Sequence, residues 1–326
     1  MDEVLINQIA GIVRSGAPLI LAAVGETFTE RVGVVNLSLN GSLMLAGLAG
    51  FVIGVSTQSH ILGMVAAMAV GMVVALIVAA SSIELKQSQV AVGFVLTLLC
   101  RDLAIFLGET WRNTKGLPTP NVTIPLLSQI PIIGEIFFQQ DIFTYLSFIV
   151  VIAAAFWIFR TRAGLALRSI GERPETSFAR GFKVNRTRYM YTALGGALVG
   201  LAGAAYTLNI FGTWAESNVD GQGWIALAIV IFGGWYPSRV ALGVYLVAAL
   251  RAFVNAQQTN ASQSTLQLLL LLPWLLMVVA LVLVSNKYLE RLLPYIPMWL
   301  HPPIRALLRA RPPAALGTTF DQEGRR

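Results

Sequence analysis

Long apolar runs without charge restrict this chain to very few kinds of fold. Residues 61–85 contain one acid, Glu84, at their edge, and residues 265–285 contain no charged residue at all. A helix needs about 20 apolar residues to cross the roughly 30 Å hydrocarbon core of a bilayer. One buried helix of a soluble protein can resemble such a run, but a series of them cannot. The sequence therefore predicts a membrane domain.

The composition agrees, because only 12% of the 326 residues are charged and 56% are hydrophobic. Soluble globular domains carry about 25% charged residues. We expect an all-α fold, a polytopic transmembrane helical bundle of about 8–10 spans that includes short or broken helices. The expected helices cover residues 5–25, 32–55, 61–83, 89–108, 142–159, 189–211, 223–235, 241–256 and 265–285.

The segment 223–235 is too short to span a bilayer at 1.5 Å per residue. It is either re-entrant or broken at Gly233 and Gly234 and ended by Pro237. Broken backbone is tolerated at membrane depth only where protein or a water-filled cavity surrounds it. This predicts that residues 221–237 line a pathway rather than face lipid.

The net charge of +7 is concentrated beside apolar runs, in residues 160–188 and in the tail. That distribution follows the positive-inside rule and argues against a nucleic-acid partner. Residues 160–188 are then cytoplasmic, and residues 109–141 and the N-terminus are external. We divide the chain into a permease domain, residues 1–285, and a basic cytoplasmic tail, residues 286–326. The protein is expected to be a multi-pass protein of the cell membrane (inner or plasma membrane), in contact with lipid.

No set of residues in the chain suits catalysis. The sequence contains no GxxxxGK[ST] motif, so it has no P-loop for ATP. His60 and His301 are far apart and Cys100 is alone, which argues against a catalytic triad, a metal site and an internal disulfide. The N-terminus begins with acids rather than a basic region, so we do not expect a signal peptide. A membrane-embedded enzyme is therefore disfavoured.

Residues 160–188 predict two short helices at the inner surface. A helix-forming stretch ends near Gly171, and Pro174 suits the first turn of a second helix, with Glu175 near its positive end. Gly181 is placed to end that helix. The segment is either a solvated basic loop or a protruding docking element.

Three motifs occur in order along the chain. They are GETFTERVGVVNLSLNG at residues 25–41, TRAGLALRSIGERPETSFARGFKV at residues 161–184 and GQGWIALAIVIFGGWYP at residues 221–237. Together they resemble the permease subunits of ATP-binding-cassette (ABC) importers of the branched-chain amino acid, sugar and nucleoside superfamily. The resemblance is closest to nucleoside permeases that work with basic membrane lipoprotein-type binding proteins, and it covers residues 16–285.

The resemblance implies two sets of site residues. The loop that docks on the ATPase would contain Gly171, Glu172, Pro174, Glu175, Ala179 and Gly181. The second set borders the translocation pathway: Glu26 and Asn36 match the family's first signature, as do Arg31 and Gly33, and Asn40, Gly223, Trp224 and Gly233 are added to the predicted pathway. From the residues alone, the charges at Glu26, Glu30 and Arg31 fit equally well a pathway or a short inner turn between two helices.

The first motif departs from the family pattern, which commonly has Gly and Glu where this chain has Ser38 and Asn40. Asn40 keeps hydrogen-bonding capacity without the cost of a buried charge. Details of substrate or gating are therefore expected to differ from those of typical relatives.

The implied function is nucleoside uptake by an ABC importer. This chain would bind no cofactor directly and would work with a cytoplasmic ATPase that uses ATP, an external substrate-binding lipoprotein and a homologous second permease, in a heterodimer. The alternatives are a permease for simple sugars or another small polar metabolite, or an ATP-independent carrier or channel. The last would predict inverted repeats or rings of pore charge, which the sequence does not show clearly.

Overall fold

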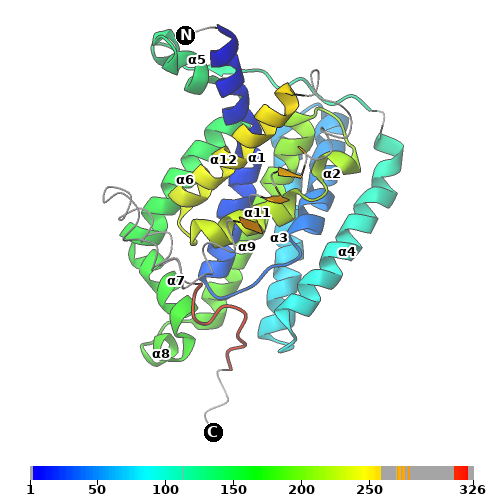
Figure 1. The fold of residues 1–326 in the computed structure, drawn as a ribbon. Helices are drawn as coiled ribbons and strands as arrows, with labels where there is room; N and C mark the ends of the chain where they lie inside the picture. Colours follow the sequence, from blue (N-terminus) through cyan, green and yellow to red (C-terminus); the bar gives the residue numbers. More distant parts are fainter. Residues whose placement is uncertain are drawn as a thin grey trace.

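The computed structural model describes residues 3–112, 114–257 and 312–321, and residues 269, 271, 272, 274, 275, 278 and 279. Seven of the helices in this part of the chain are long and apolar enough to cross a membrane. The expected all-α membrane bundle is confirmed (Figure 1). These spans are α1 (Glu3–Arg31), α2 (Leu39–Thr57), α3 (His60–Ile83), α4 (Gln89–Gly108), α6 (Ile142–Arg160), α9 (Val184–Ala204) with its π-helical extension η3 (Ala205–Ile210), and α12 (Pro237–Ala256).

Helix α9 lies at the centre of the bundle and packs against α1, α2 and α3. Small residues make these contacts close. A Cβ on Gly200 would collide with the backbone of Ala67 in α3, and one on Gly203 would collide with the backbone of Leu43 in α2. In lipid, helices associate through such close packing rather than through hydrophobicity. The glycines of α9 are therefore packing residues.

Several helices begin at residues whose side chains accept the first free N–H groups. Asp141 Oδ1 accepts from the backbone N–H groups of Phe143 and Thr144 at 2.9 and 3.0 Å, at the start of α6. Ser88 caps α4 in the same way through the N–H of Ala91. Side-chain caps of this kind satisfy donors that have no partner within the helix.

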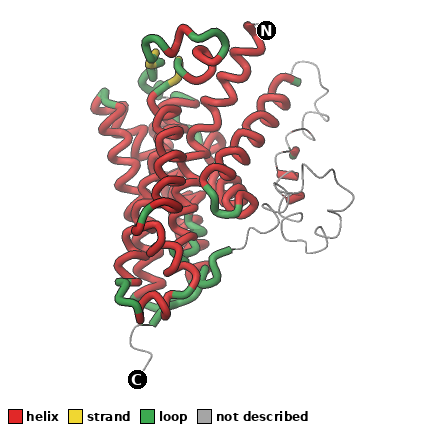
Figure 2. Tube along the Cα trace, turned by 90° about the vertical axis from the view of Figure 1, so that its left-hand side faces the viewer, coloured by secondary structure: helices red, strands yellow, loops and turns green. Residues whose placement is uncertain are grey.

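The two ends of the bundle differ in structure. At one end lie the N-terminus and residues 109–141 (Figure 2). These residues form η1 (Glu109–Trp111), η2 (Leu127–Gln129), α5 (Ile133–Phe137) and an antiparallel pair of two-residue strands, β1 (Val122–Thr123) and β2 (Gln139–Gln140). At the other end, which we call the basic end, lie α7 (Arg162–Glu172), α8 (Pro174–Ala179) and residues 312–321 (Figure 1).

The first two helices differ from those predicted. Helix α1 continues past Gly25 to Arg31, and the predicted helix 32–55 was wrong over residues 32–38, which form a turn and extended backbone. Gly33 has φ +92°, and the side chain of Asn36 accepts hydrogen bonds from the backbone N–H and the hydroxyl of Ser38. Such local bonds compete with helix formation.

The short helix in residues 221–237 is present as predicted. Helix α11 (Gln222–Gly233) has 12 residues, which is too few to cross a bilayer. It follows the one-turn α10 (Glu216–Val219) and ends at Gly234, whose backbone is left-handed at φ +65°. Pro237 then begins α12. Most of the predicted span 265–285 and most of the predicted tail, residues 286–326, lie outside the described residues.

Candidate functional site

Asn40, in the first turn of α2, connects this helix to the start of α11. Its Oδ1 accepts hydrogen bonds from the backbone N–H groups of Gly221 and Gly223 at 2.9 and 3.2 Å. Its Nδ2 donates to Oδ1 of Asp220 at 2.8 Å. The first N–H groups of a helix have no partner within that helix, so Asn40 caps α11 from a neighbouring helix. Because Asn40 is 1% exposed, this polar junction lies inside the bundle.

Asp220 also pairs with Arg101 of α4, whose Nε lies 3.1 Å from Oδ2 of the carboxylate. Arg101 lies about 18 Å along α4 from its start at 1.5 Å per residue. The pair is thus a charged group at membrane depth, and such groups usually face a partner or a watery space.

The turn 32–38 leads from α1 to this junction and is held by a buried carboxylate. Glu26 Oε1 accepts the backbone N–H of Asn36 at 3.3 Å, and both residues are almost completely buried. No hydrogen bond reaches the other oxygen, Oε2, from the described residues. A turn does follow Arg31, as the second interpretation of this region expected, whereas a place in the pathway stays a prediction.

The other end of α11 is attached to the end of α1. The indole N–H of Trp235 donates to the Glu30 carboxylate, and Nε of Arg31 donates to the carbonyl of Trp235 at 3.0 Å. The Arg31 guanidinium also lies over the ring of Tyr236, 5.1 Å from its centroid. Helix α11 therefore runs from the Asn40 junction to the basic end, and both of its ends are fixed by residues from the first motif.

The predicted pathway residues do not form one cluster. Asn40 and Gly223 are in contact, and Glu26 is bonded to Asn36. Trp224 is half-buried, with its ring 5.7 Å from that of Phe94 in α4. Gly233 lies at the opposite end of α11, against Val240 of α12. Their role in translocation stays a prediction.

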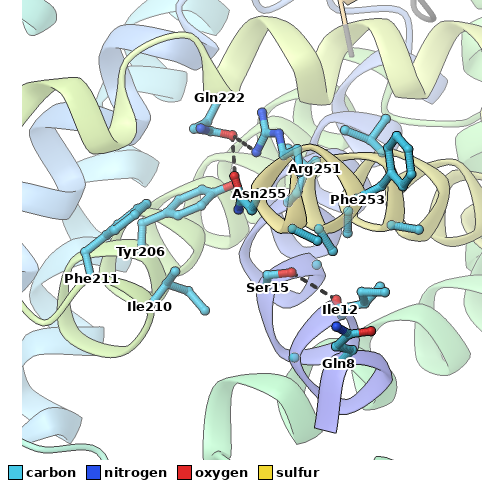
Figure 3. Close-up of a pocket in the computed structure, with 18 residues that line it drawn as sticks. Gln8, Ile12, Ser15, Tyr206, Ile210, Phe211, Gln222, Arg251, Phe253 and Asn255 are labelled. Atoms are coloured by element: carbon cyan, nitrogen blue, oxygen red, sulfur yellow. Dashed lines mark hydrogen bonds between the residues drawn. The ribbon is translucent and has the colours of Figure 1, made fainter. Parts of the chain in front are cut away.

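A cavity of about 690 Å³ opens beside α11, between α1, η3 and α12 (Figure 3). A second cavity of about 620 Å³ shares Phe211, Gln222, Arg251 and Asn255 with it and extends to Asp220. The wider turns of η3 place Tyr206 at the first cavity, and π-helical turns occur frequently at functional sites. The two cavities thus lead toward the Asn40 junction.

Polar groups from three elements converge in this cavity. Gln222 Oε1 accepts hydrogen bonds from Nη1 of Arg251 at 2.9 Å and from the hydroxyl of Tyr206 at 3.2 Å (Figure 3). The ring of Tyr206 is stacked on that of Phe211, with centroids 6.1 Å apart and planes 19° apart. An apolar wall with a few convergent polar groups is typical of small-molecule sites.

The basic end carries the predicted coupling residues on two short helices, as expected. Thr161 caps α7 by accepting the N–H of Gly164 at 3.0 Å, and Pro174 begins α8. Gly181, at φ +89°, lets the chain turn from α8 toward α9. A side chain at this φ would be strained, which explains the glycine.

The six predicted coupling residues fall into two groups by burial. Gly171 and Pro174 are buried, and a Cβ on Gly171 would collide with the carbonyl of Arg31. The exposed residues are Glu172, Glu175, Ala179 and Gly181. Only the exposed group can contact a partner directly, while the buried group fixes α7 and α8 on the bundle. Docking itself stays a prediction.

The site residues that sequence reasoning missed are Arg101, Asp220, Tyr206, Gln222 and Arg251. A usable signal existed for four of them, since Arg101 and Arg251 interrupt the apolar runs 89–108 and 241–256, Asp220 directly precedes the third motif, and Gln222 is its second residue. Charges within apolar stretches are functional candidates. Nothing in the local sequence distinguished Tyr206. Among the described residues, no group of three His, Cys, Asp or Glu is placed to hold a metal ion.

Comparison with known proteins gives several relatives of similar length. A protein of Haloferax volcanii that bears the name of a glucose ABC transporter permease is 36% identical over 251 residues, 76% of each chain. A nucleoside ABC transporter permease of Lactococcus lactis is 31% identical, over 86% of this chain and 92% of its own. A guanosine ABC transporter permease of Bacillus subtilis is 33% identical, over 81% of this chain and 88% of its own. No solved structure matches the chain.

The family comparison covers most of the sequence. Residues 8–283 match the model for the permease component of branched-chain amino acid transport systems. The match includes all three sequence motifs and every span described above, apart from the first five residues of α1. Since the described part of the chain alone has seven helices able to cross a bilayer, the protein is a multi-pass protein of the plasma membrane. The chain belongs to the family of branched-chain amino acid transport system permease components, and it is an ABC transporter permease of the branched-chain amino acid, sugar and nucleoside type.

Proposed function

We propose that this chain is a permease subunit of an importer that takes up nucleosides delivered by an external binding protein. A separate cytoplasmic ATPase supplies the energy, and a second, homologous permease completes the membrane domain. The chain itself contains no GxxxxGK[ST] motif, so ATP is used by the partner. Two of its relatives, those of Lactococcus lactis and Bacillus subtilis, are named as nucleoside and guanosine permeases.

The cavity beside α11 is the observation that carries the nucleoside assignment. It combines the stacked rings of Tyr206 and Phe211 with an amide and a guanidinium that share one hydrogen bond. Aromatic faces stack on nucleobases with a gain of about 1–3 kcal/mol per base. The donors and acceptors of Gln222 and Arg251 suit the edge of a base or the hydroxyl groups of ribose. A neutral, planar solute fits this chemistry.

A simple sugar is the second candidate, because the relative with 36% identity bears the name of a glucose permease. Sugar hydroxyl groups would also bond to Gln222 and Arg251 in the cavity, and a sugar ring would pack on Tyr206. The two substrates differ because only a nucleoside has a base, which adds size and a π-face that stacks on aromatic rings. Competition between nucleoside and glucose for uptake therefore shows which of them the permease carries.

The test is uptake into proteoliposomes that contain this chain with its second permease, its ATPase and its binding protein. Labelled guanosine, uridine and glucose are compared, each with ATP and with a non-hydrolysable analogue. We expect ATP-dependent uptake of nucleosides that an excess of glucose does not inhibit. Uptake of glucose alone would transfer the assignment to sugars, and uptake that continues without the ATPase would refute an ABC mechanism.

A charge reversal tests the docking of the ATPase. Glu175 is exposed on α8 at the basic end, so Glu175→Arg should weaken the association of the ATPase and reduce uptake while leaving the membrane domain folded. Glu135→Arg is the matched control, because Glu135 is also exposed but lies in α5 at the opposite end of the bundle. Equal effects of both substitutions, or of neither, would count against docking at α8.

A further inference from the structure

Residues 312–321 lie against the basic end of the bundle, although they are far from α7 and α8 in sequence. Figure 1 shows this segment in red, close to the lower end of α1. Pro313, Ala315 and Phe320 are buried against the bundle, whereas Pro312, Ala314 and Thr319 are exposed. One face of the segment is therefore seated on the protein and the other is open to a partner. We call residues 312–321 the strap.

The first half of the strap is bonded to the end of α7. The N–H of Ala315 donates to the carbonyl of Gly171 at 2.9 Å. The N–H of Ala314 donates to Oε2 of Glu172 at 3.3 Å. Gly171 and Glu172 are both predicted coupling residues, so the strap touches the docking element directly.

The second half of the strap reaches three other parts of the basic end. The N–H of Gly317 donates to the carbonyl of Gly33, at 3.2 Å, in the turn 32–38. The carbonyl of Thr318 accepts from Nη1 of Arg188, a buried residue at the start of α9, at 3.2 Å. Lys86, between α3 and α4, donates to the carbonyl of Phe320 at 2.8 Å and lies 3.7 Å from the Asp321 carboxylate.

Phe320 connects the strap to α8, because its ring packs edge-on against that of Phe178 in this helix, with centroids 5.8 Å apart. A single short segment thus contacts α7, α8, α9, the turn 32–38 and the α3–α4 connection. The turn 32–38 continues to Asn36 and Asn40, and Asn40 holds the start of α11. Hydrogen bonds therefore link α7 to the strap and the strap to the turn 32–38, and the chain runs from this turn directly to the polar junction at Asn40. A displacement of α7 and α8 can be transmitted along these connections.

We propose that the strap is a coupling element, which transmits the movement that the ATPase imposes on α7 and α8 to the turn 32–38 and so to the junction at Asn40. This inference rests on the proposed function, since it requires an ATPase at the basic end. The backbone bonds at Gly171 and Gly33 hold the strap to both elements, so the two move together. Without the strap, α7 and α8 still bind the ATPase, but their movement reaches the turn less effectively.

The first experiment separates coupling from folding and assembly. Lys86→Ala and Phe320→Ala each remove one anchor of the strap, and Thr319→Ala, at an exposed neighbouring position, is the matched control. A chain that ends at residue 311 removes the strap completely. Each variant is assembled with its partner subunits in proteoliposomes, and the nucleoside transported per ATP hydrolysed is measured. Coupling between sites commonly changes equilibria by 5–150-fold, so we expect this ratio to fall about tenfold for the two anchor variants.

A second experiment needs no substrate. Val35→Cys places a reporter thiol in the turn 32–38, while Cys100, the only native cysteine, is buried. In nanodiscs that contain the complete complex, the rate of maleimide labelling at position 35 is compared between the nucleotide-free and the ATP–vanadate-trapped states. We expect a change of several-fold in the chain with the strap and no change in the chain that ends at residue 311.

The outcomes distinguish the two proposals. If the anchor variants assemble and hydrolyse ATP, but transport less per ATP than Thr319→Ala, the strap couples. If their ratio is unchanged, if they fail to assemble with the ATPase, or if position 35 responds equally without the strap, the inference is overturned. If the unaltered complex takes up no nucleoside, the proposed function fails, whereas the labelling at position 35 still decides the role of the strap.

Discussion

Gly223 lies directly against the backbone of Asn40, with no space for a side chain between α11 and α2. A Cβ on Gly223 would collide with the backbone N and Cα of Asn40. The same contact brings the N–H of Gly223 to Oδ1 of Asn40 at 3.2 Å. Two sequence motifs that are about 180 residues apart therefore depend on each other for their geometry. The hydrogen bond requires the close approach, and the close approach requires glycine.

The first prediction follows from this contact. Gly223→Ala should force α11 away from α2, break the bond to Asn40 and lower the free energy of unfolding by about 1–3 kcal/mol, the usual cost of overpacking. Gly11→Ala is the control, because a Cβ on Gly11 in α1 meets nothing within 4 Å. That change should be neutral or should stabilise the helix by up to about 1 kcal/mol. Thermal unfolding in detergent measures both, and equal shifts would contradict the proposed contact.

The apolar runs were enough to predict the fold, because a bilayer accepts few alternatives to a helix. They failed at residues 32–38, where Val32, Val34 and Val35 suit a span equally well. The bonds that bend the chain there come from Glu26 and from Asn36 itself. A hydropathy pattern contains no information on such side-chain bonds to the backbone. The predicted helix therefore began at residue 32, seven residues before the observed start of α2.

The functional site was predicted less completely than the fold, for a physical reason. Asn40 and the motif at residues 221–237 were among the predicted residues, but Arg101 comes from another segment and Asp220 lies just before the motif. A motif shows residues that are close in sequence, whereas the junction depends on α4 lying beside α2. The cavity shows the same limit, since Tyr206, Gln222 and Arg251 meet only after the chain has folded.

The second prediction concerns the buried bond between Trp235 and Glu30. Trp235→Phe keeps most of the ring but removes the N–H that donates to the carboxylate, and both residues are at most 3% exposed. A buried acceptor left without this donor should cost about 1–3 kcal/mol of unfolding free energy. In the control, Trp157→Phe, the hydroxyl of Tyr191 loses the indole donor but keeps its own bond to the carbonyl of Ala163, and no buried carboxylate loses a donor, so the loss should be smaller. A larger loss for the control would refute the assignment.

The third prediction concerns substrate in the cavity. Arg251→Gln removes a charged donor that bonds to Gln222, and the hydrogen bond of a charged group is worth about 1.5–3 kcal/mol. If the guanidinium contacts substrate in transit, the concentration for half-maximal uptake should rise at least about tenfold. Assembly and basal ATP hydrolysis should be unchanged. Leu246→Ala, on the exposed face of the same helix, is the control and should change neither. Unaltered uptake by Arg251→Gln would exclude the cavity as part of the route.

The fourth prediction tests why this chain has Asn40 where the family pattern commonly has an acid. The structure supplies a negative charge from another segment, because Asp220 accepts a hydrogen bond from Asn40 Nδ2 at 2.8 Å. Asn40→Asp would place two carboxylates in contact within the bundle, where like charges strongly disfavour each other. We expect a clear loss of thermal stability and of uptake, because the cap of α11 and the pair with Arg101 are both disturbed.

The double variant Asn40→Asp with Asp220→Asn separates repulsion from a general intolerance of change at position 40. The exchange leaves one carboxylate and one amide in contact, so a hydrogen bond between the two positions can form again, with the new amide at position 220 as donor. If repulsion is the cause, the double variant should recover about 0.5–3 kcal/mol relative to the sum of the single changes, the usual range for coupled neighbours. Additive losses would show instead that an N–H donor is required at position 40 itself, because an aspartate oxygen still accepts from the N–H groups of Gly221 and Gly223. In that case the hydrogen bond that Nδ2 of Asn40 donates to Asp220, rather than repulsion between two carboxylates, determines the residue at this position.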